Sequence, residues 1–570
     1  MADQSVLDVR DLEVAYRHRG GQAANVLERI SFDLRRGEIV SLLGESGSGK
    51  STIARALSGL LPPSAHIAGG SLRIGEHAFE RLGAARVPWE RIRGKRIGLL
   101  GQDARQALHP LMKIREQFED VLRFHRMAAK KQVPSVAKKV LDMLRFPDPE
   151  RVLESYPFEL SGGMCQRVCL ALALCLEPEA LLADEPTSAL DTVSQRDVLE
   201  LLRRSREELG LSVLLITHDI AVASAIGDRV LVLNRGRLVE QGDARTVLRS
   251  PRSDYTRQLL ASRAQIGEAR PPRRRSDGET VLEVKNVVKG FAGGRNVLQG
   301  VNLSIPRGRI VGILGESGSG KSTLAKCIVG LESIDAGRIL YKGRDVAAMR
   351  RAEKRRMCRH VQLIFQDARA CLHPGRTALE LVQEPLTYMR IGKRKERREK
   401  ALALLEAVGI DGEAMHRTPP QLSTGQCQRI AIARALAPGP DLLLCDEAVS
   451  ALDMTVQAQI LALLHRLQES FGFSLVMISH DTRVLRSFCH EIAVMENGAI
   501  AEVLPAERLH ESERPYTRLL LACGSDIEGT LWPEGEKTSD RHDSGYDRRD
   551  AAREDTEQQH AERRASLVEV

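Results

Sequence analysis

Two stretches of this chain combine the residue types of a phosphate-binding loop. The same nine residues, Gly-Glu-Ser-Gly-Ser-Gly-Lys-Ser-Thr, occupy positions 44–52 and 315–323. Glycines at this spacing let backbone N–H groups surround phosphates, while the lysine reaches the terminal phosphates and the following serine can ligate Mg²⁺. A chance glycine-rich turn would not repeat all of these types together. The sequence therefore predicts two nucleotide sites, with contacts from Gly44, Ser46, Gly47, Gly49, Lys50, Ser51 and Thr52, and from Gly315, Ser317, Gly318, Gly320, Lys321, Ser322 and Thr323.

Three further motifs follow each loop in the same order. Leu-Ser-Gly-Gly-Met begins at Leu160 and Leu-Ser-Thr-Gly-Gln at Leu422, and each is followed by an Asp-Glu pair and then a histidine. An isolated acidic pair would be an ordinary exposed strand end. The equal intervals between these motifs in both halves indicate instead one duplicated chemical site, whose further members are Asp184, Glu185, His218, Asp446, Glu447 and His480.

The elements that must position these residues indicate an α/β fold. Each loop follows an apolar run, 39–43 or 310–314, and precedes a helix-like stretch, which is the context that the motif requires. The runs 180–183, 213–217 and 229–233 indicate buried strands of a mainly parallel sheet, with ligands at the carboxyl ends. Stretches rich in Leu, Ala, Lys and Glu then predict an inserted helical subdomain in each half.

Length and composition fit two such halves. At 570 residues the chain has room for about four domains, which suits two cores that each carry a helical subdomain. Aromatic residues are only 4%, so aliphatic side chains must form the cores. The ten cysteines include no Cys-x-x-Cys pair, which favours buried thiols over disulfides or zinc. No apolar run approaches a membrane span and no signal peptide is apparent, which predicts a cytoplasmic protein.

Changes of composition predict the domain borders. We expect a first nucleotide-binding domain at 1–261, a flexible basic Pro/Arg linker at 262–280, a second nucleotide-binding domain at 281–532 and a disordered charged tail at 533–570. The net charge of +8 is modest for this length. Basic residues concentrate at 270–275 and 393–400, where the sequence alone favours a solvated linker and a solvated helix face.

Together these motifs resemble the fused ATPase subunit of an ATP-binding-cassette (ABC) transporter with two complete cassettes, over nearly all of residues 5–523. The resemblance implies two tandem P-loop NTPase domains that bind ATP and Mg²⁺. It also implies roles for single residues, although a lone aromatic or glutamine would otherwise be ordinary. Tyr16 and Phe291 would stack on adenine; Gln102, Gln366, Ser51, Ser322, Asp184 and Asp446 would hold Mg²⁺; Glu185 and Glu447 would polarise the attacking water; His218 and His480 would contact the terminal phosphate.

The Leu-Ser motifs resemble the signature of the same family. Ser161 with Gly163, and Ser423 with Gly425, would form anion sites at helix starts that act across a dimer interface. Each ATP would then be shared, one between the Lys50 loop and the Ser423 signature and the other between the Lys321 loop and the Ser161 signature. Thr424 replaces the usual glycine of the second signature. We therefore expect the site built on Lys50 to be the weaker one.

Two stretches narrow the subfamily. A stretch of Gln-Asp-Ala-Arg followed by Leu-His-Pro begins at Gln102 and again at Gln366. It resembles the Gln-Asp-Pro and Leu-Asn-Pro stretch of ATPases from bacterial dipeptide, oligopeptide and nickel importers. The alanine and the histidine, at His109 and His373, are departures from that pattern. Tyr-Thr-Arg near the end of each half, at Tyr255 and Tyr516, resembles the ending of the same group. Only Cys523 follows the second ending, so we expect no iron–sulfur centre.

The leading hypothesis is an ATPase, peripheral at the cytoplasmic face of the inner membrane, that drives uptake of a peptide-like solute or a nickel or other metal chelate. The implied partners are two transmembrane permease subunits and an extracytoplasmic solute-binding protein, and no nucleic acid. The alternative is a tandem-cassette translation factor acting on the ribosome. Such factors insert a long charged helical linker between cassettes, and the linker expected here is too short. DNA-repair cassettes would need zinc-binding cysteine pairs.

Overall fold

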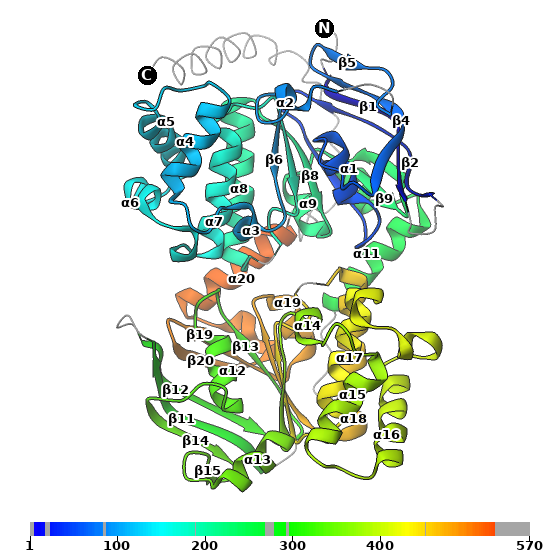
Figure 1. Cartoon of the computed structure of the whole chain (residues 1–570). Coiled ribbons are helices and arrows are strands. Elements are labelled where there is room, and N and C mark those ends of the chain that lie inside the picture. The colour runs from blue at the N-terminus through cyan, green and yellow to red at the C-terminus, as the bar shows by residue number, and fades with distance from the viewer. Residues whose placement is uncertain are drawn as a thin grey trace, which may run out of the picture. The chain divides into compact units, whose positions relative to one another are not determined.

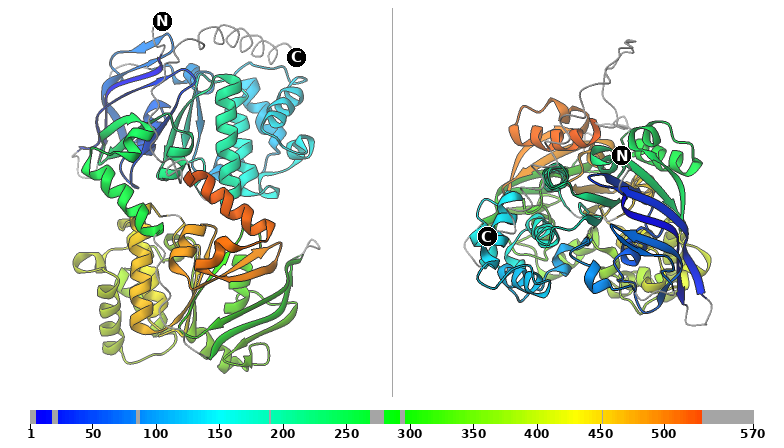
Figure 2. Two further views of the ribbon diagram at one scale, coloured as in Figure 1. Left: turned by 180° about the vertical axis from the view of Figure 1, so that it is seen from behind. Right: turned by 90° about the horizontal axis from the view of Figure 1, so that it is seen from above.

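The structure of this chain is a computed structural model that describes residues 5–17, 23–83, 87–188, 190–267, 279–291, 296–450 and 452–529. The chain divides into two compact units. The first contains most of residues 1–260 and the second most of residues 261–524. Figure 1 and Figure 2 show that each unit consists of sheets flanked by helices.

The first unit contains two sheets. A four-stranded antiparallel sheet has the order β2-β1-β4-β5, and a six-stranded sheet has the order β10-β9-β3-β8-β7-β6. In the six-stranded sheet only β10 runs antiparallel to its neighbour. The central strands are continuous apolar runs because they are buried, in part against α1 and the antiparallel sheet. The strands are β1 (Ser5–Arg17), β2 (Ala23–Arg35), β3 (Ile39–Leu43), β4 (Ala65–Ile74), β5 (His77–Phe79), β6 (Ile97–Leu100), β7 (Ala180–Asp184), β8 (Ser212–Thr217), β9 (Arg229–Asn234) and β10 (Arg237–Asp243).

The helices of the first unit form two groups. One group packs on the sheets, and the other is a helical lobe inserted between β6 and β7 (Figure 1). The lobe contains α3 (Ala104–Ala107), α4 (Ile114–Phe124), α5 (Val133–Met143), α6 (Pro149–Glu154), the short 3-10 helix η1 (Pro157–Glu159) and α7 (Gly162–Leu174). The remaining helices are α1 (Lys50–Leu57), α2 (Trp89–Ile92), α8 (Thr192–Leu209), α9 (Ile220–Ile226), α10 (Ala244–Arg249) and α11 (Asp254–Gly267).

The second unit repeats this architecture. Its antiparallel sheet has the order β12-β11-β14-β15 and its six-stranded sheet the order β16-β17-β18-β13-β19-β20. The strands are β11 (Thr280–Gly290), β12 (Asn296–Pro306), β13 (Ile310–Leu314), β14 (Ala336–Tyr341), β15 (Arg344–Asp345), β16 (Val361–Ile364), β17 (Leu442–Asp446), β18 (Ser474–Ser479), β19 (Glu491–Glu496) and β20 (Ala499–Pro505). The helices are α12 (Lys321–Val329), α13 (Arg351–His360), α14 (Ala368–Cys371), α15 (Ala378–Tyr388), α16 (Arg394–Ala407), η2 (Gly412–His416), η3 (Pro419–Gln421), α17 (Thr424–Leu436), α18 (Met454–Phe471), α19 (Thr482–Phe488), η4 (Ala506–Glu511) and α20 (Pro515–Gly529).

Aliphatic side chains form the core of each unit, as the low aromatic content predicts. In the first unit, a single buried cluster joins the two sheets to α1 and contains Leu42, Leu57 and Leu214. In the second, the corresponding cluster joins the sheets to α12 and contains Ile313, Ile328 and Val476. Phosphate-loop helices are thus anchored by their apolar faces in the same cores that hold the strands.

The predicted α/β fold, with mainly parallel cores and inserted helical lobes, is confirmed. The domain borders stay predictions, but α11 continues to Gly267 and so enters the segment 262–280 expected to be a linker. Residues 268–278 and 530–570 lie outside the described residues. Within the described part of the chain, no helix is both long and apolar enough for a membrane span.

One glycine turn in each unit ties the two sheets to the phosphate loop. Gly236 lies between β9 and β10, where its N–H donates to Ser48 O at 2.9 Å and its carbonyl accepts the N–H of Glu28 at 2.8 Å. Gly498 makes the equivalent bonds to Ser319 and Gln299, at 3.1 and 2.8 Å. This backbone is left-handed, with φ of 77° at Gly236 and 83° at Gly498, which favours glycine.

Gly236→Ala should therefore lower the unfolding midpoint of the first unit more than Gly37→Ala does. Both positions have positive φ, so each alanine carries strain of roughly 1 kcal/mol. At Gly236 a Cβ would also lie 2.1 Å from Val26 O, whereas at Gly37 it would meet no atom within 4 Å. That overlap should add about 1–3 kcal/mol. Thermal unfolding followed by circular dichroism measures both variants, and equal midpoints would contradict the steric argument.

Candidate functional site

The order of the sheet brings the predicted residues together. In the first unit β3 pairs with β8 and β8 pairs with β7, all in parallel. Because their carboxyl ends share one edge, that edge collects the phosphate loop after β3, Asp184 at the end of β7 and His218 after β8. The second unit repeats this placement with β13, β17 and β18. The loop, the Asp-Glu pair and the histidine predicted from sequence therefore meet in space within each unit.

The lysine of each loop is buried and held by the loop itself. Lys50 Nζ donates to the carbonyls of Gly44 and Glu45 at 2.6 and 2.8 Å, and Lys321 Nζ donates to those of Gly315 and Glu316 at 2.9 and 2.7 Å. Burial lowers the pKa of Lys321. The glycine before each lysine has a left-handed φ, 108° at Gly49 and 106° at Gly320, which turns the chain into the helix.

Close backbone approach fixes the start of each loop. A Cβ at Gly44 would lie 2.4 Å from Leu233 O, and one at Gly315 would lie 2.4 Å from Met495 O. Only glycine therefore fits at these two positions. The carbonyls belong to β9 and β19, so the loops are seated directly on the sheet.

A serine and an aspartate of each site share a hydrogen bond. Ser51 Oγ donates to Asp184 Oδ1 at 3.1 Å, and Ser322 Oγ donates to Asp446 Oδ1 at 2.9 Å. Burial raises the pKa of both aspartates, because the ionised form loses solvation there. Two hard oxygen ligands this close together can coordinate one Mg²⁺.

The adjacent glutamate has a partner on each carboxylate oxygen. Glu185 Oε2 accepts from Gln102 Nε2 at 2.9 Å, and Glu185 Oε1 lies 3.2 Å from His218 Nδ1. In the second unit the distances from Glu447 are 2.9 Å to Gln366 and 3.5 Å to His480. Both glutamates have positive φ, 48° and 47°, and their N–H groups donate to the neighbouring strand. Strained backbone of this kind collects at functional sites.

The pKa of the glutamate in each site shifts in the opposite direction from that of the neighbouring aspartate. Burial tends to raise the pKa of Glu185 and Glu447, but the hydrogen bond and charge of the facing histidine outweigh it and lower the pKa of each. Reciprocally, burial tends to lower the pKa of His218 and His480, and the facing glutamate raises it. The glutamates are therefore held ionised, which suits a group that orients water.

The two signature serines begin helices of the lobes. Ser161 Oγ accepts the N–H of Met164 at 3.2 Å and starts α7, and Ser423 Oγ accepts the N–H of Gln426 at 3.2 Å and starts α17. Gln426 Oε1 also accepts the N–H of Ser423 at 3.0 Å, which completes a capping box. The start of α17 therefore has a second fixed hydrogen bond that Met164 cannot supply in α7.

The aromatic residues predicted to meet adenine lie at the ends of strands. Tyr16 is near the end of β1 and packs partly buried against the first core. Phe291 follows β11, is 49% exposed, and has Lys289 Nζ 5.3 Å from its ring centre. An exposed ring is available for stacking, so the predicted role of Phe291 stays open to test.

Two tyrosines support the loops, and sequence reasoning did not assign them this task. The hydroxyl of Tyr255 accepts the N–H of Glu45 at 3.1 Å, and that of Tyr516 accepts the N–H of Glu316 at 3.0 Å. Burial raises the pKa of Tyr516 to about 12, so its hydroxyl stays neutral. The repeated Tyr-Thr-Arg endings were the signal, but a sequence pattern alone could not place them beside the loops.

The histidines that depart from the importer pattern preserve a local turn. His109 Nδ1 accepts the N–H of Leu111 at 3.3 Å, and His373 Nδ1 accepts the N–H of Gly375 at 3.2 Å. An asparagine oxygen makes the same bond two residues onward in an Asx-turn. The substitution of histidine for asparagine therefore keeps the acceptor that shapes this loop.

Each loop also contains a buried hydroxyl that fits a phosphate ligand. Ser48 Oγ and Ser319 Oγ have no hydrogen-bond partner among the described residues. Buried polar groups are almost always satisfied, so an oxygen-rich ligand in the loop is the natural partner. Together with Lys50 and Lys321, these groups fit the phosphates of a nucleotide.

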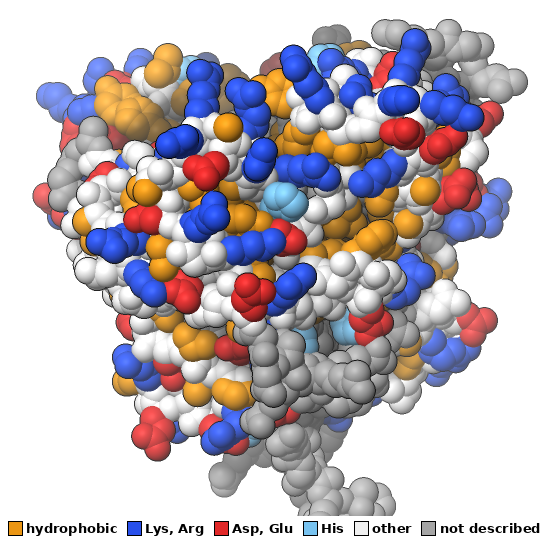
Figure 3. Space-filling model, turned by 90° about the horizontal axis from the view of Figure 1, so that it is seen from below, with side chains coloured by type: hydrophobic (Ala, Val, Ile, Leu, Met, Phe, Trp, Pro, Cys, Tyr) orange, Lys and Arg blue, Asp and Glu red, His pale blue; other side chains and the backbone are white. Residues whose placement is uncertain are grey.

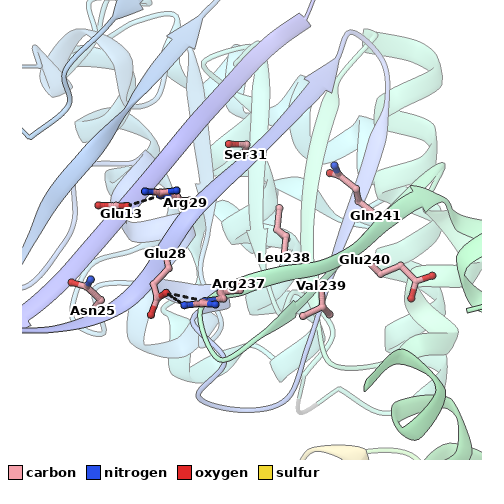
Figure 4. Close-up of a pocket in the computed structure, with 10 residues that line it drawn as sticks. All are labelled: Glu13, Asn25, Glu28, Arg29, Ser31, Arg237, Leu238, Val239, Glu240 and Gln241. Carbon is pink, nitrogen blue, oxygen red and sulfur yellow. Dashed lines mark hydrogen bonds and ion pairs between the residues drawn. The ribbon is translucent and has the colours of Figure 1, made fainter. Parts of the chain in front are cut away.

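A separate polar groove of about 810 Å³ lies in the first unit between β2 and β10, and it is not the predicted site. Figure 4 shows its lining residues, which include two ion pairs, Glu13 with Arg29 and Glu28 with Arg237, and also Glu240, whose carboxylate accepts backbone N–H groups of Arg252 and Ser253. None of the predicted nucleotide contacts lines this groove.

Comparison with known proteins agrees with this geometry. Residues 27–188 and 298–450 match the family described as ABC transporter. The chain is 35% identical over 562 residues to the glutathione import ATP-binding protein GsiA of Salmonella choleraesuis (strain SC-B67), covering 91% of this chain and 89% of the relative. GsiA of Escherichia coli (strain K12) is 35% identical over 561 residues with the same coverage.

A solved structure is also similar: the dimeric post-hydrolysis state of the ATP-binding cassette MJ0796 bound to ADP and Pi. It is 34% identical, with 40% of this chain and 99% of that chain covered and a TM-score of 0.37. The family match in both halves and the identity along nearly the whole chain give the same assignment. This chain belongs to the ABC transporter family and is an ATPase with two ATP-binding cassettes.

Proposed function

We propose that this chain is the ATPase of an importer, in which ATP hydrolysis drives uptake of a peptide-like solute or a nickel or other metal chelate through two separate transmembrane permease subunits. The observation that carries the proposal is the complete set of lysine, serine, aspartate, glutamate, glutamine and histidine at the strand ends of both units. The relatives named above are import ATP-binding proteins, which supports the direction of transport. An extracytoplasmic solute-binding protein would deliver the solute, and the chain would lie at the cytoplasmic face of the inner membrane.

The residues divide the work of phosphoryl transfer among themselves. Backbone N–H groups of each loop and Lys50 or Lys321 bind the phosphates, while Ser51 with Asp184, or Ser322 with Asp446, would hold Mg²⁺, which neutralises phosphate charge when bound. Glu185 or Glu447 then orients the attacking water. Gln102 or Gln366 lies against this glutamate and reports its state toward the permease.

We further propose that the cassettes pair within one chain, so that each ATP meets the loop of one cassette and the signature of the other. The Lys50 loop would face Ser423 with Gly425, and the Lys321 loop would face Ser161 with Gly163. Helix starts supply the N–H groups that bind anions in such an arrangement.

The relatives direct the choice of solute to be tested. GsiA is named for glutathione, itself a short peptide, so we propose a small peptide as the first candidate. When the gene for this chain is deleted from cells that normally encode it, they should lose uptake of labelled glutathione, dipeptide or nickel chelate. Restoring the gene should restore that uptake. Unchanged uptake of all three solutes would contradict the proposal.

The ribosome is the competing destination, and no comparison supports it. Isolation of the tagged chain from detergent-solubilised cells distinguishes the two destinations. Membrane permeases in the isolate support the importer. Ribosomal proteins without permeases would overturn it.

Replacing both water-orienting glutamates should stop turnover and spare binding. Glu185→Gln together with Glu447→Gln removes the charge that orients water but leaves the phosphate loops intact. We expect ATP hydrolysis to fall at least about 100-fold, as general base catalysis typically contributes that much. Labelled ATP retained by the variant should equal or exceed that retained by the parent. Hydrolysis near the parental rate would show that another group orients the water.

The two sites should be unequal because of Thr424. This residue is the first of α17 and its side chain is exposed, and a Cβ at the equivalent Gly162 would meet no atom within 4 Å. The backbone there is helical and suits threonine, so backbone strain at Thr424 is not the cause. Because the side chain is exposed in its own unit, any steric cost falls on the nucleotide that docks against it.

Lys321→Ala should therefore cost more ATPase activity than Lys50→Ala, since the former leaves only the site that faces Thr424. Adding Thr424→Gly to Lys321→Ala should then recover activity, about twofold or more if the methyl group is the obstacle. Thr424→Gly added to Lys50→Ala is the matched control and should change little. Equal losses from the two lysine variants would refute the asymmetry.

A further inference from the structure

A basic surface of the second unit takes no part in the nucleotide site. On α13, Arg351, Lys354, Arg355 and Arg356 are exposed, and only Met357 of that helix is buried. Among the residues that the structure describes, none of these four cations has a carboxylate within ion-pair distance. A helix with so little buried surface and so much unpaired charge gains little from its own packing.

A second group of cations comes from α16 and the turn that precedes it. Its exposed members are Arg390, Lys393, Arg394, Arg398 and Lys400. In the described part of the chain these five also lack a carboxylate at ion-pair distance. We call the nine residues of the two groups the α13–α16 basic face.

The two groups belong to one surface. Burial, and then the positive charge of Arg359 in the last turn of α13, lower the pKa of Lys400 on α16. Figure 1 shows α13 and α16 both toward the lower end of the second unit, which agrees with this repulsion. Figure 3 shows Lys and Arg side chains gathered on the face that the second unit presents in that view.

Nearby carboxylates do not neutralise this face. Glu353 accepts the N–H of Arg350 at 2.9 Å and pairs with Arg344, and Glu396 accepts the N–H of Lys393 at 2.8 Å. In the helical lobe of the first unit, by contrast, lysines are paired: Lys130 with Glu119 and Lys138 with Glu150. The lobe of the first unit thus pairs part of its basic charge, although Arg126 and Lys131 are also exposed there.

We propose that the α13–α16 basic face binds the anionic headgroups of a phospholipid membrane. A row of unpaired lysines and arginines is attracted to such a surface by charge alone. Single-stranded nucleic acid would favour several stacking aromatics, and Tyr388 is the one large exposed aromatic described on α15 and α16. The choice of a membrane over nucleic acid rests on the proposed function, which places the chain beside a bilayer.

Vesicle sedimentation with the purified full chain tests this contact without any permease. The chain should sediment with phosphatidylcholine vesicles that contain phosphatidylglycerol and not with pure phosphatidylcholine. The fourfold variant Arg351→Gln, Lys354→Gln, Arg355→Gln and Arg356→Gln should bind at least about tenfold more weakly. The second variant, Arg394→Gln with Arg398→Gln and Lys400→Gln, tests the same face from α16 in case the first fails to fold.

A charge-matched control separates the face from net charge. Arg36, Arg126, Arg245 and Arg249 are exposed in the first unit, and their change to glutamine removes the same four charges. This control should keep vesicle binding within about twofold of the parent. Equal weakening by control and α13 variant would overturn the proposal, as would an α13 variant that loses RNA binding and keeps vesicle binding. Because the vesicles hold no permease, either result leaves the uptake experiment to judge the importer on its own.

Discussion

Seating of each phosphate loop on the sheet through backbone contacts is the constraint on which the rest of the structure depends. Gly44 and Gly315 lie so close to carbonyls of β9 and β19 that no side chain fits, and Gly236 and Gly498 return a hydrogen bond to each loop. The buried lysine then satisfies carbonyls of the same loop. Since these contacts involve main chain on both sides, the position of the phosphates is fixed before any nucleotide arrives.

The parallel strands fix where the other groups of the site lie relative to the phosphate loop. Asp184 and His218 end neighbouring strands, so their distances from the loop follow from the spacing of the sheet. The same spacing lets Glu185 meet both Gln102, which follows β6, and His218, which follows β8. The signature serines lie in the lobes, and their proposed nucleotide contacts require the pairing of cassettes.

The α/β fold and the groups at each strand end could be predicted from sequence because the chain contains the same motifs twice and in the same order. The intervals from the signature to the Asp-Glu pair and on to the histidine are also equal in both halves. Three features could not. Tyr255 and Tyr516 lie far from the loops in sequence, so their hydrogen bonds to Glu45 and Glu316 appear only when the chain is folded. The capping box at Ser423 depends on one residue, Gln426. The first residues of the expected linker continue helix α11 to Gly267, and composition alone does not predict this continuation.

The two partners of Glu185 have a further consequence for how this carboxylate could orient water. One oxygen of this carboxylate accepts from Gln102 and the other faces His218, so each oxygen has one partner and can still accept a further hydrogen bond. Under its proposed role, the glutamate would orient a water molecule whose direction these two partners help to fix. Gln102 lies between β6 and α3, where the sheet leads into the lobe, so a movement of the lobe would change that direction. Under the proposed role, the position of the lobe would therefore influence how well the water is oriented and how fast ATP is hydrolysed.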